Sequence, residues 1–195
     1  MIDASKVTDF KRNKSQLEEF LLFSIAVSGK TANVTARNLE RFLQWGRKEY
    51  RVKNPFDVVK NIELDQLGPI MKSYGFGCWK MKSKGFHEAA NSGFDLNTCS
   101  VEQLETIHGI AQKTSRFFVM HSRENQQLAC LDVHILNWMR NFTGYEIPKI
   151  TPKGKKYIEI ENQFLSIAEA MNISPADLDL KIWMAQRGGY EILAA

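Results

Sequence analysis

Apolar residues recur at the spacing of an α-helix along almost the whole of this 195-residue chain. Signals for β-strands are almost absent, and glycine, proline and asparagine mark the breaks between helical segments, as at Asn54-Pro55. The predicted helices cover residues 16–27, 35–50, 63–74, 80–91, 133–142, 155–171 and 175–186, together with two shorter helices between residues 100 and 122. The sequence therefore predicts an all-α fold.

The two shorter helices are joined by a very tight turn. Ser100 is a good N-cap for the first helix, whose apolar residues recur at i, i+3 and i+6, and Gly109 can end it. The second helix begins near Gln112. The free backbone N–H groups at its start face a small, uncrowded loop, and together with the positive end of the helix dipole they favour an anion. A DNA phosphate fits such a site.

Two residues near this hairpin can carry chemistry. Lys113 lies in the first turn of the second helix, where a cation is disfavoured by roughly 0.3 to 1 kcal/mol. A function is one reason to tolerate it; a solvated surface lysine, or one that only pairs with phosphate, is the simpler interpretation. Asp132 follows nineteen residues later and is a favoured N-cap for the predicted helix 133–142. Capping and catalysis are compatible, so the pair indicates an amine nucleophile with a carboxylate partner.

The pattern L-x-x-I-x-G-I-x-x-K-T, followed by Asp-x-His at the start of the next helix, resembles the helix-hairpin-helix DNA glycosylase/AP lyase superfamily. Bifunctional members of that superfamily carry this lysine and this aspartate. Residues 155–183 are similar to the C-terminal region of the archaeal-type 8-oxoguanine DNA glycosylase/lyase family. Residues 31–43 are similar to the segment that enters the minor groove beside the lesion in such enzymes. These segments cover well over a third of the chain, in the expected order.

The resemblance implies a two-lobed helix-hairpin-helix fold with the active site in the cleft between the lobes. Residues 1–195 would form a single glycosylase unit. Residues from about 20 to 105 would form the middle helical lobe. Residues 1–19 together with 106–195 would form the other lobe, which carries the hairpin, the catalytic pair and the C-terminal helices.

The chemistry implied for Lys113 is attack by its neutral amine on C1′ of a damaged nucleotide, followed by strand cleavage through a Schiff base and β-elimination. At pH 7 only about one lysine in two thousand is neutral, so a proton must be removed. A neighbouring carboxylate holds an ammonium group charged, whereas desolvation lowers its pKa. We therefore expect Asp132 to stabilise positive charge on the sugar and to relay a proton.

The damaged base must leave the duplex to expose C1′. By resemblance, Asn33 and Arg37 would face the estranged partner base, residues 76–79 with Trp79 would wedge beside it, and Trp183 would stack on the flipped base. Each residue also has a simpler interpretation. Asn33 would be a helix cap, Arg37 a solvated residue, and Trp79 and Trp183 core residues. Further DNA contacts are expected at Gly109, Ala111 and Thr114. The backbone carbonyls of Glu105, Ile107 and Ile110 would hold a structural K⁺ or Na⁺ ion. Lys80, Lys82 and Lys84 spread around their predicted helix, so one or two of them can reach phosphates.

The net charge of +4 is mild, so DNA binding would depend on local placement of basic groups. Cys78, Cys99 and Cys130 form no CxxC motif and no signal sequence precedes them, which predicts free thiols in a cytoplasmic, nucleoid-associated protein. No cysteine follows Cys130, which excludes the iron–sulfur cluster of endonuclease III-like relatives, and the four histidines form no metal motif. No apolar run approaches the ~18 residues of a membrane span. The expected protein is a monomer that binds damaged double-stranded DNA and requires no cofactor.

The chain departs from the family pattern at its C-terminus. The archaeal-type family ends in a lysine whose terminus takes part in recognising the oxidised base, whereas this chain continues as RGGYEILAA. The carboxylate of Ala195, or backbone near Gly188-Gly189, could substitute. Within the hairpin, Ala111 replaces a glycine and Ser115 an alanine, and both are small enough to keep the clamp.

Three functions remain open at this point. The first is a bifunctional glycosylase/lyase for 8-oxoguanine. The second is the same enzyme class acting on an oxidised pyrimidine, a mismatched thymine or a modified base. The third is a non-catalytic DNA-binding module, which would not need Asp132 opposite Lys113.

Overall fold

A computed structural model describes residues 2–3 and 5–188, with side chains as far as residue 185. This part of the chain contains ten α-helices and no β-strand, which confirms the predicted all-α class. The helices are α1 (Lys14–Val27), α2 (Ala32–Tyr50), α3 (Pro55–Lys60), α4 (Leu64–Ser73), α5 (Trp79–Asn91), α6 (Val101–Glu105), α7 (Gln112–Ser122), α8 (Val133–Phe142), α9 (Lys155–Ala170) and α10 (Pro175–Gly188).

Side chains cap the start of several helices, among them Asn13 at α1, Ser100 at α6 and Asp132 at α8. Ser100 caps α6 as expected: its hydroxyl accepts the Gln103 N–H at 3.2 Å, and the Gln103 side chain accepts the Ser100 N–H at 2.9 Å. This reciprocal pair is a capping box. Helix α6 ends at Glu105, earlier than the expected stop at Gly109, which instead lies in the turn with φ +82°. Glycine adopts that conformation without a steric penalty.

Helix α3 was not predicted. Asn54-Pro55 marks the end of the preceding segment, but Pro55 also occupies the first position of α3. Proline is favoured there because its missing N–H has no intrahelical partner to lose. The buried carboxylate of Glu18 accepts the next N–H, from Phe56, at 3.1 Å.

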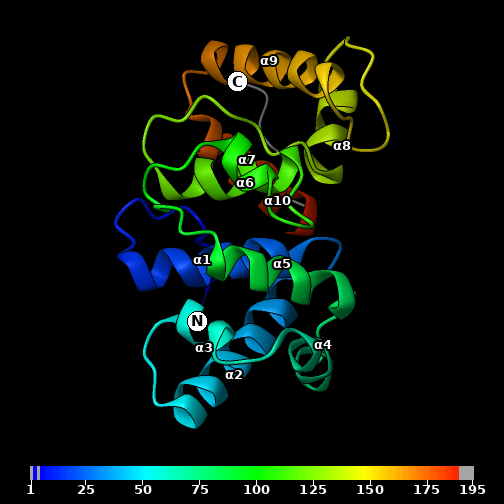
Figure 1. Cartoon of the computed structure of the whole chain (residues 1–195). Coiled ribbons are helices and arrows are strands. Elements are labelled where there is room, and N and C mark those ends of the chain that lie inside the picture. Colours follow the sequence, from blue (N-terminus) through cyan, green and yellow to red (C-terminus); the bar gives the residue numbers. More distant parts are fainter. Residues whose placement is uncertain (1, 4, 189–195) are drawn as a thin grey trace.

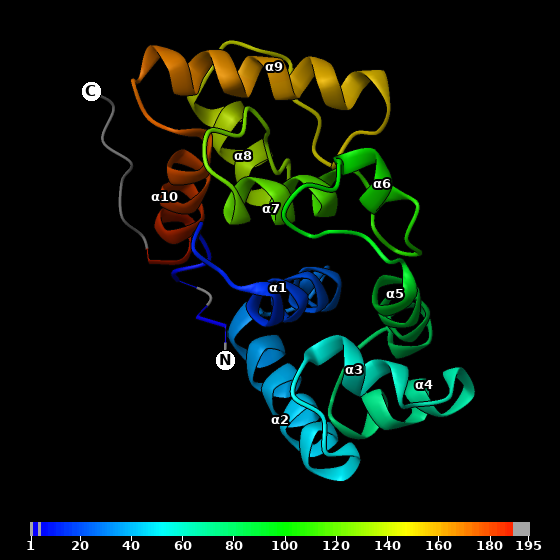
Figure 2. The same cartoon turned by 60° about the vertical axis from the view of Figure 1, so that its left-hand side comes forward.

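The buried hydrophobic residues form two main cores. The first gathers α1 to α5 and includes residues of the hairpin and α7, such as Ile107 and Phe118. The second gathers α8, α9 and α10 and includes Ala129 and Leu131. Figures 1 and 2 show α2, α3 and α4 at one end and α8 and α9 at the other, with α1 and α5 facing α7 and α10 between them. The lobe boundaries near residues 20 and 105 stay a prediction.

The N-terminal segment is attached to the C-terminal end of α7. The N–H of Asp9 donates to the carbonyl of His121 at 3.1 Å, and the Arg12 guanidinium donates to the same carbonyl at 2.8 Å. The Thr8 hydroxyl lies 2.8 Å from His121 Nδ1. A segment that precedes α1 therefore contacts the helix that carries Lys113.

Helix α5 supports the hairpin turn at close range. A Cβ atom on Gly85 would lie 2.5 Å from the carbonyl oxygen of His108, so only glycine permits this approach. Three residues further along α5, the Glu88 carboxylate accepts the His108 N–H at 2.6 Å. These two contacts fix the hairpin turn relative to the first core.

Candidate active site

A cavity of about 1010 Å³ lies where several parts of the chain meet. Its walls include the α1–α2 loop, the hairpin, the start of α8 and helix α10. Lys113, Asp132 and Trp183 all line it, although they are far apart in sequence. The fold therefore brings together the expected nucleophile, its carboxylate partner and the expected base-stacking residue.

Lys113 is half-buried in the first turn of α7. The N-cap of that helix is Ala111, whose side chain cannot accept a hydrogen bond, so no side chain caps the helix start. The Lys113 ammonium lies 5.3 Å from the centre of the Phe117 ring, one turn further along α7. At that distance the face of the ring attracts the cation.

Burial lowers the pKa of Lys113, but Cys130, Asp132 and Asp179 raise it, and the net shift is upward. Burial also raises the pKa of the Cys130 thiol well above its ordinary value, so that thiol is neutral at pH 7. Negative charge around the ammonium therefore comes from the carboxylates. In this DNA-free state Lys113 is charged and must lose a proton before it can act as a nucleophile.

Asp132 is the N-cap of α8, as the simpler interpretation predicted. Its Oδ1 accepts the N–H of His134 at 2.8 Å and the N–H of Ile135 at 3.0 Å. Oδ2 makes no hydrogen bond within the described part of the chain. One oxygen therefore fixes the carboxylate and the other is available to the cavity chemistry.

Asp179, on α10, is a second cavity carboxylate that sequence reasoning missed. It is 7% exposed, and its Oδ2 lies 3.2 Å from Nε2 of the fully buried His121. Burial raises the pKa of Asp179, and the hydrogen bond and charge of His121 oppose that shift. Asp179 and Trp183 are four residues apart on a predicted helix, so their shared face was a usable signal.

Comparison with known proteins identifies the family. No family profile matches the chain. The 8-oxoguanine DNA glycosylase/AP lyase of Metallosphaera sedula is 34% identical over 193 residues, which cover 94% of this chain and 90% of that protein. The chain belongs to the archaeal-type 8-oxoguanine DNA glycosylase/AP lyase family. The protein of the same name from Methanocaldococcus jannaschii is 36% identical over 87 residues, covering 44% of this chain and 41% of that protein.

Solved glycosylase structures share the fold. The crystal structure of the M. jannaschii 8-oxoguanine DNA glycosylase matches with a TM-score of 0.69 and 21% identity, covering 95% of this chain and 84% of that one. The crystal structure of the Thermotoga maritima 8-oxoguanine DNA glycosylase matches with a TM-score of 0.70 and 20% identity, and the match covers 92% of this chain and 83% of that one. The M. jannaschii enzyme in complex with a 15-mer DNA containing 8-oxoguanine matches with a TM-score of 0.70 and 21% identity, and the match covers 97% of this chain and 90% of that one. The expected glycosylase fold is confirmed.

The hairpin residues proposed for DNA binding, Gly109, Ala111 and Thr114, all line the cavity. Ala111 is exposed, whereas Thr114 is only 4% exposed. Contact of DNA with the Thr114 hydroxyl would therefore require access through the cavity, and all three contacts stay predictions.

Asn33 and Arg37 are both exposed on α2, four residues apart and therefore on one face. Neither lines the cavity, although Lys30, Thr31 and Ala32 immediately before them do. Thr31, not Asn33, occupies the N-cap position of α2. Contacts of Asn33 and Arg37 with an estranged base stay predictions.

The expected wedge at residues 76–79 is narrower than predicted. Phe76 is a core residue, 5% exposed, with its ring 6.0 Å from that of Phe42. Trp79 is half-buried against α4, where a Cβ on Gly68 would lie 2.9 Å from the indole ring. Gly77 and Trp79 are half-buried and Cys78 is exposed, so parts of these three residues can face DNA. The DNA contact of Trp79 stays a prediction.

The three lysines of α5 differ in exposure. Lys82 is 1% exposed and donates to the carbonyl of Ala26 at the end of α1, so it is a structural lysine and not a phosphate contact. Lys80 and Lys84 are exposed. The alternating spacing of these lysines predicted that they would lie on different faces of the helix, but it did not predict which of them would be buried.

Trp183 is half-buried where it lines the cavity. This position fits a base-stacking residue better than a pure core residue, because part of the ring is accessible. The suggested substitutes for the family's terminal lysine, the Ala195 carboxylate and the Gly189 backbone, lie outside the described residues. Gly188, the other residue of that suggestion, is the last residue of α10.

No group of three or more histidine, cysteine, aspartate or glutamate side chains in the described residues could hold a metal ion. The carbonyl of Ile107, one of three suggested cation ligands, accepts the Ile110 N–H at 3.0 Å and keeps a second lone pair for an ion. The described part of the chain also contains no helix with the length and hydrophobicity to cross a membrane.

Proposed function

We propose that this chain is a bifunctional enzyme that flips 8-oxoguanine out of duplex DNA, removes it and cleaves the resulting abasic strand. The observation that carries the proposal is the meeting of Lys113 and Asp132 in one cavity of a chain from this family. The amine is the nucleophile and the carboxylate supports charge and proton transfer. A protein that only binds DNA through its hairpin would need neither the amine nor the carboxylate in this cavity.

The reaction begins when the flipped nucleotide enters the cavity. Lys113 gives up a proton, and its neutral amine attacks C1′ as the bond from C1′ to the base breaks. The base leaves with the bonding electrons and takes up a proton. The attacking nitrogen then loses a further proton, and its lone pair breaks the bond from C1′ to the ring oxygen, which takes up a proton as the sugar opens to the protonated Schiff base. Removal of a 2′ proton finally expels the 3′ phosphate by β-elimination.

Asp132 is suited to stabilise the positive charge that develops on the sugar as the base departs. Its Oδ1 is fixed by two backbone N–H groups of α8, so the carboxylate is already oriented before substrate arrives. Preorganised charge of this kind costs no reorganisation during the reaction. Oδ2 is then the oxygen that relays protons.

The base pocket falls on α10. Trp183 offers a ring for stacking on the flipped base, and Asp179, one turn earlier, offers a carboxylate acceptor in the same cavity. The Watson–Crick edge of a guanine carries N–H donors, which such an acceptor can bind. Stacking supplies affinity for a purine, and the carboxylate favours a donor edge.

Several accompanying assignments belong to the same proposal. DNA would contact the hairpin through Gly109 and Ala111, with Asn33 and Arg37 on the side of the estranged base. A K⁺ or Na⁺ ion on the hairpin carbonyls would strengthen phosphate binding there. The enzyme would act as a monomer in the cytoplasm.

A panel of duplexes with borohydride trapping tests the proposal. The panel holds 8-oxoguanine, an oxidised pyrimidine, a thymine mismatch and a pre-formed abasic site, each on the same sequence. We expect a covalent adduct on the 8-oxoguanine and abasic duplexes. An adduct on another lesion in place of 8-oxoguanine would favour the second function. Binding without any adduct, even on abasic DNA, would contradict an enzyme.

A further inference from the structure

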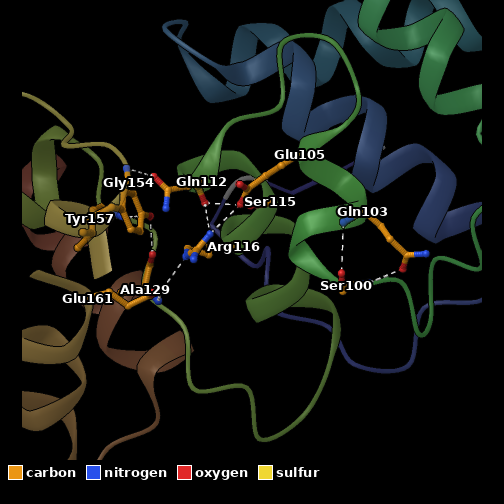
Figure 3. Close-up of polar contacts among 11 residues, drawn as sticks. Ser100, Gln103, Glu105, Gln112, Ser115, Arg116, Ala129, Gly154, Tyr157 and Glu161 are labelled. Carbon is orange, nitrogen blue, oxygen red and sulfur yellow. Dashed lines mark hydrogen bonds and ion pairs between the residues drawn. The ribbon is translucent and has the colours of Figure 1, made fainter. Parts of the chain in front are cut away.

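A buried polar network connects the helix of Lys113 to the segment that ends at Asp132 (Figure 3). Arg116, one turn after Lys113 on α7, is 5% exposed. Its Nε donates to Glu161 Oε1 on α9 at 2.8 Å, and its Nη1 donates to Glu105 Oε1 on α6 at 2.9 Å. Arg116 therefore ties α7 to two other helices.

The residues directly before Asp132 belong to no helix, and side chains of α9 make several of the hydrogen bonds to their backbone. Tyr157, which is fully buried, donates its hydroxyl proton to the Ala129 carbonyl at 2.7 Å and accepts the Leu131 N–H at 3.1 Å. Glu161 Oε1 accepts the Ala129 N–H at 2.9 Å. Burial raises the pKa of Tyr157, so the phenol keeps the proton that it donates.

Glu161 Oε1 is the junction of the network. The same oxygen accepts from Arg116, three residues after Lys113, and from Ala129, three residues before Asp132. The Arg116 guanidinium also lies 4.9 Å from the centre of the Tyr157 ring. One carboxylate oxygen therefore connects the helix of Lys113 to the backbone segment that leads to Asp132.

A buried ion pair is weak evidence for stability, because hydrophobic replacements are often as stable. The hydrogen bonds of this network indicate a role other than stability. Tyr157 and Glu161 bond to the backbone of residues 129 and 131, directly before Asp132. A displacement of about 1 Å in a reacting group can reduce a rate by about 100-fold, so this backbone segment is where rigidity matters.

We propose that Arg116, Glu161 and Tyr157 are positioning residues that set the separation of the Lys113 amine and the Asp132 carboxylate. This inference rests on the proposed function, since it assigns a purpose to the distance between two residues placed in the chemistry. None of the three lines the cavity, so they act through the backbone and not on DNA.

Tyr157→Phe is the most specific test, because it removes only the hydroxyl. Phe164→Leu is the matched control: Phe164 lies on the same helix, is fully buried in the same core and makes no hydrogen bond to residues 129–131. Both variants should lower Tm. Single-turnover Schiff-base formation on a pre-formed abasic duplex should slow by about 10- to 100-fold in Tyr157→Phe and by less than about twofold in Phe164→Leu. DNA affinity should stay within about twofold for both. Equal rates in the two variants would overturn the proposal.

A second measurement separates this inference from the proposed function. NMR titration of labelled lysine side chains, assigned with Lys113→Gln, reports the pKa of Lys113 without any substrate. We expect this pKa to fall in Tyr157→Phe, as Asp132 loses its fixed position, and to stay unchanged in Phe164→Leu. If the wild type forms no adduct with any DNA, the proposed function fails, yet the titration still decides whether Tyr157 positions Asp132. An unchanged Lys113 pKa in Tyr157→Phe would contradict the positioning role.

Discussion

Lys113, in the first turn of α7, and Asp132, the N-cap of α8, line the same cavity. Asp132 was predicted to be a helix cap, a catalytic carboxylate, or both, and each role uses a different oxygen of its side chain. Oδ1 caps the helix, and Oδ2 makes no hydrogen bond among the described residues. A single substitution can therefore separate the two roles.

Asp132→Asn should retain the cap and lose the charge, because asparagine caps helices as well as aspartate does. We expect Tm to change little and the single-turnover rate of base removal to fall by about 100-fold or more. Asp132→Ala should lose the rate and, in addition, about 1 kcal/mol of unfolding free energy. Thermal melts beside excision assays measure both quantities. An Asn variant with the wild-type rate would show that the carboxylate only caps.

The rate of strand cleavage on abasic DNA should rise with pH. Burial lowers the pKa of Lys113, but the groups around the ammonium raise this pKa by more than burial lowers it. The ammonium form therefore dominates at neutral pH. Below that pKa the neutral fraction grows about tenfold for each pH unit. Cleavage measured from pH 6 to pH 9 should therefore increase across the whole range. A rate that falls or stays flat would mean that deprotonation of Lys113 does not limit the reaction.

The same shift has a consequence for stability. Because the folded pKa lies above the unfolded one, the folded protein binds this proton more tightly. The stabilisation from Lys113 is present at neutral pH and is lost as pH rises through the folded pKa. Urea titrations at pH 7 and above pH 10 should show a smaller alkaline loss of stability in Lys113→Gln than in the wild type.

Trp183→Ala should weaken binding of a duplex that carries 8-oxoguanine. Loss of stacking on one base costs about 1–3 kcal/mol, or about 5- to 150-fold in Kd. Trp183→Phe should lose less, because it keeps an aromatic face. A duplex with an abasic analogue serves as the control, since it has no base to stack and should bind both variants almost equally. An equal loss on both duplexes would place Trp183 in general DNA binding.

Gly109→Ala tests the hairpin clamp. A Cβ there would meet only Met81 Cγ at 3.8 Å, so the cost comes from φ +82° and amounts to about 1–2 kcal/mol of unfolding free energy. Gly93→Ala is the matched control, because Gly93 has φ +70°, open space around it and no place in the cavity wall. Both variants should melt earlier, and only Gly109→Ala should weaken DNA binding. Equal DNA affinity in the two would remove Gly109 from the interface.

Local signals in the sequence predicted much of the fold. The α8 helix runs over residues 133–142 as expected, since Asp132 caps it and its apolar spacing is regular. Helix α3 escaped prediction because Asn54-Pro55 was interpreted only as a break, whereas Pro55 is the first residue of α3. The burial of Lys82 escaped for a different reason: the Ala26 carbonyl that it contacts lies 56 residues earlier in the chain.

The site was only partly predictable for the same reason. Lys113 and Asp132 could be selected from a short pattern, and the fold places both in one cavity. Asp179 joins them because α10 packs beside α7, and its contact with His121 spans 58 residues. The junction at Glu161 spans 45 residues to Arg116. Such contacts follow from how helices pack, which spacing within one helix does not reveal.

The most direct test of the central claim is to locate the covalent bond. Wild-type protein is trapped with borohydride on an 8-oxoguanine duplex, digested with trypsin and analysed by mass spectrometry. We predict the nucleotide adduct on Lys113, within a peptide of residues 85–116, because trypsin does not cleave after a modified lysine. Lys113→Gln should bind the duplex and give no adduct. An adduct on another amine, such as the cavity residue Lys30, or undiminished trapping in Lys113→Gln, would contradict the account.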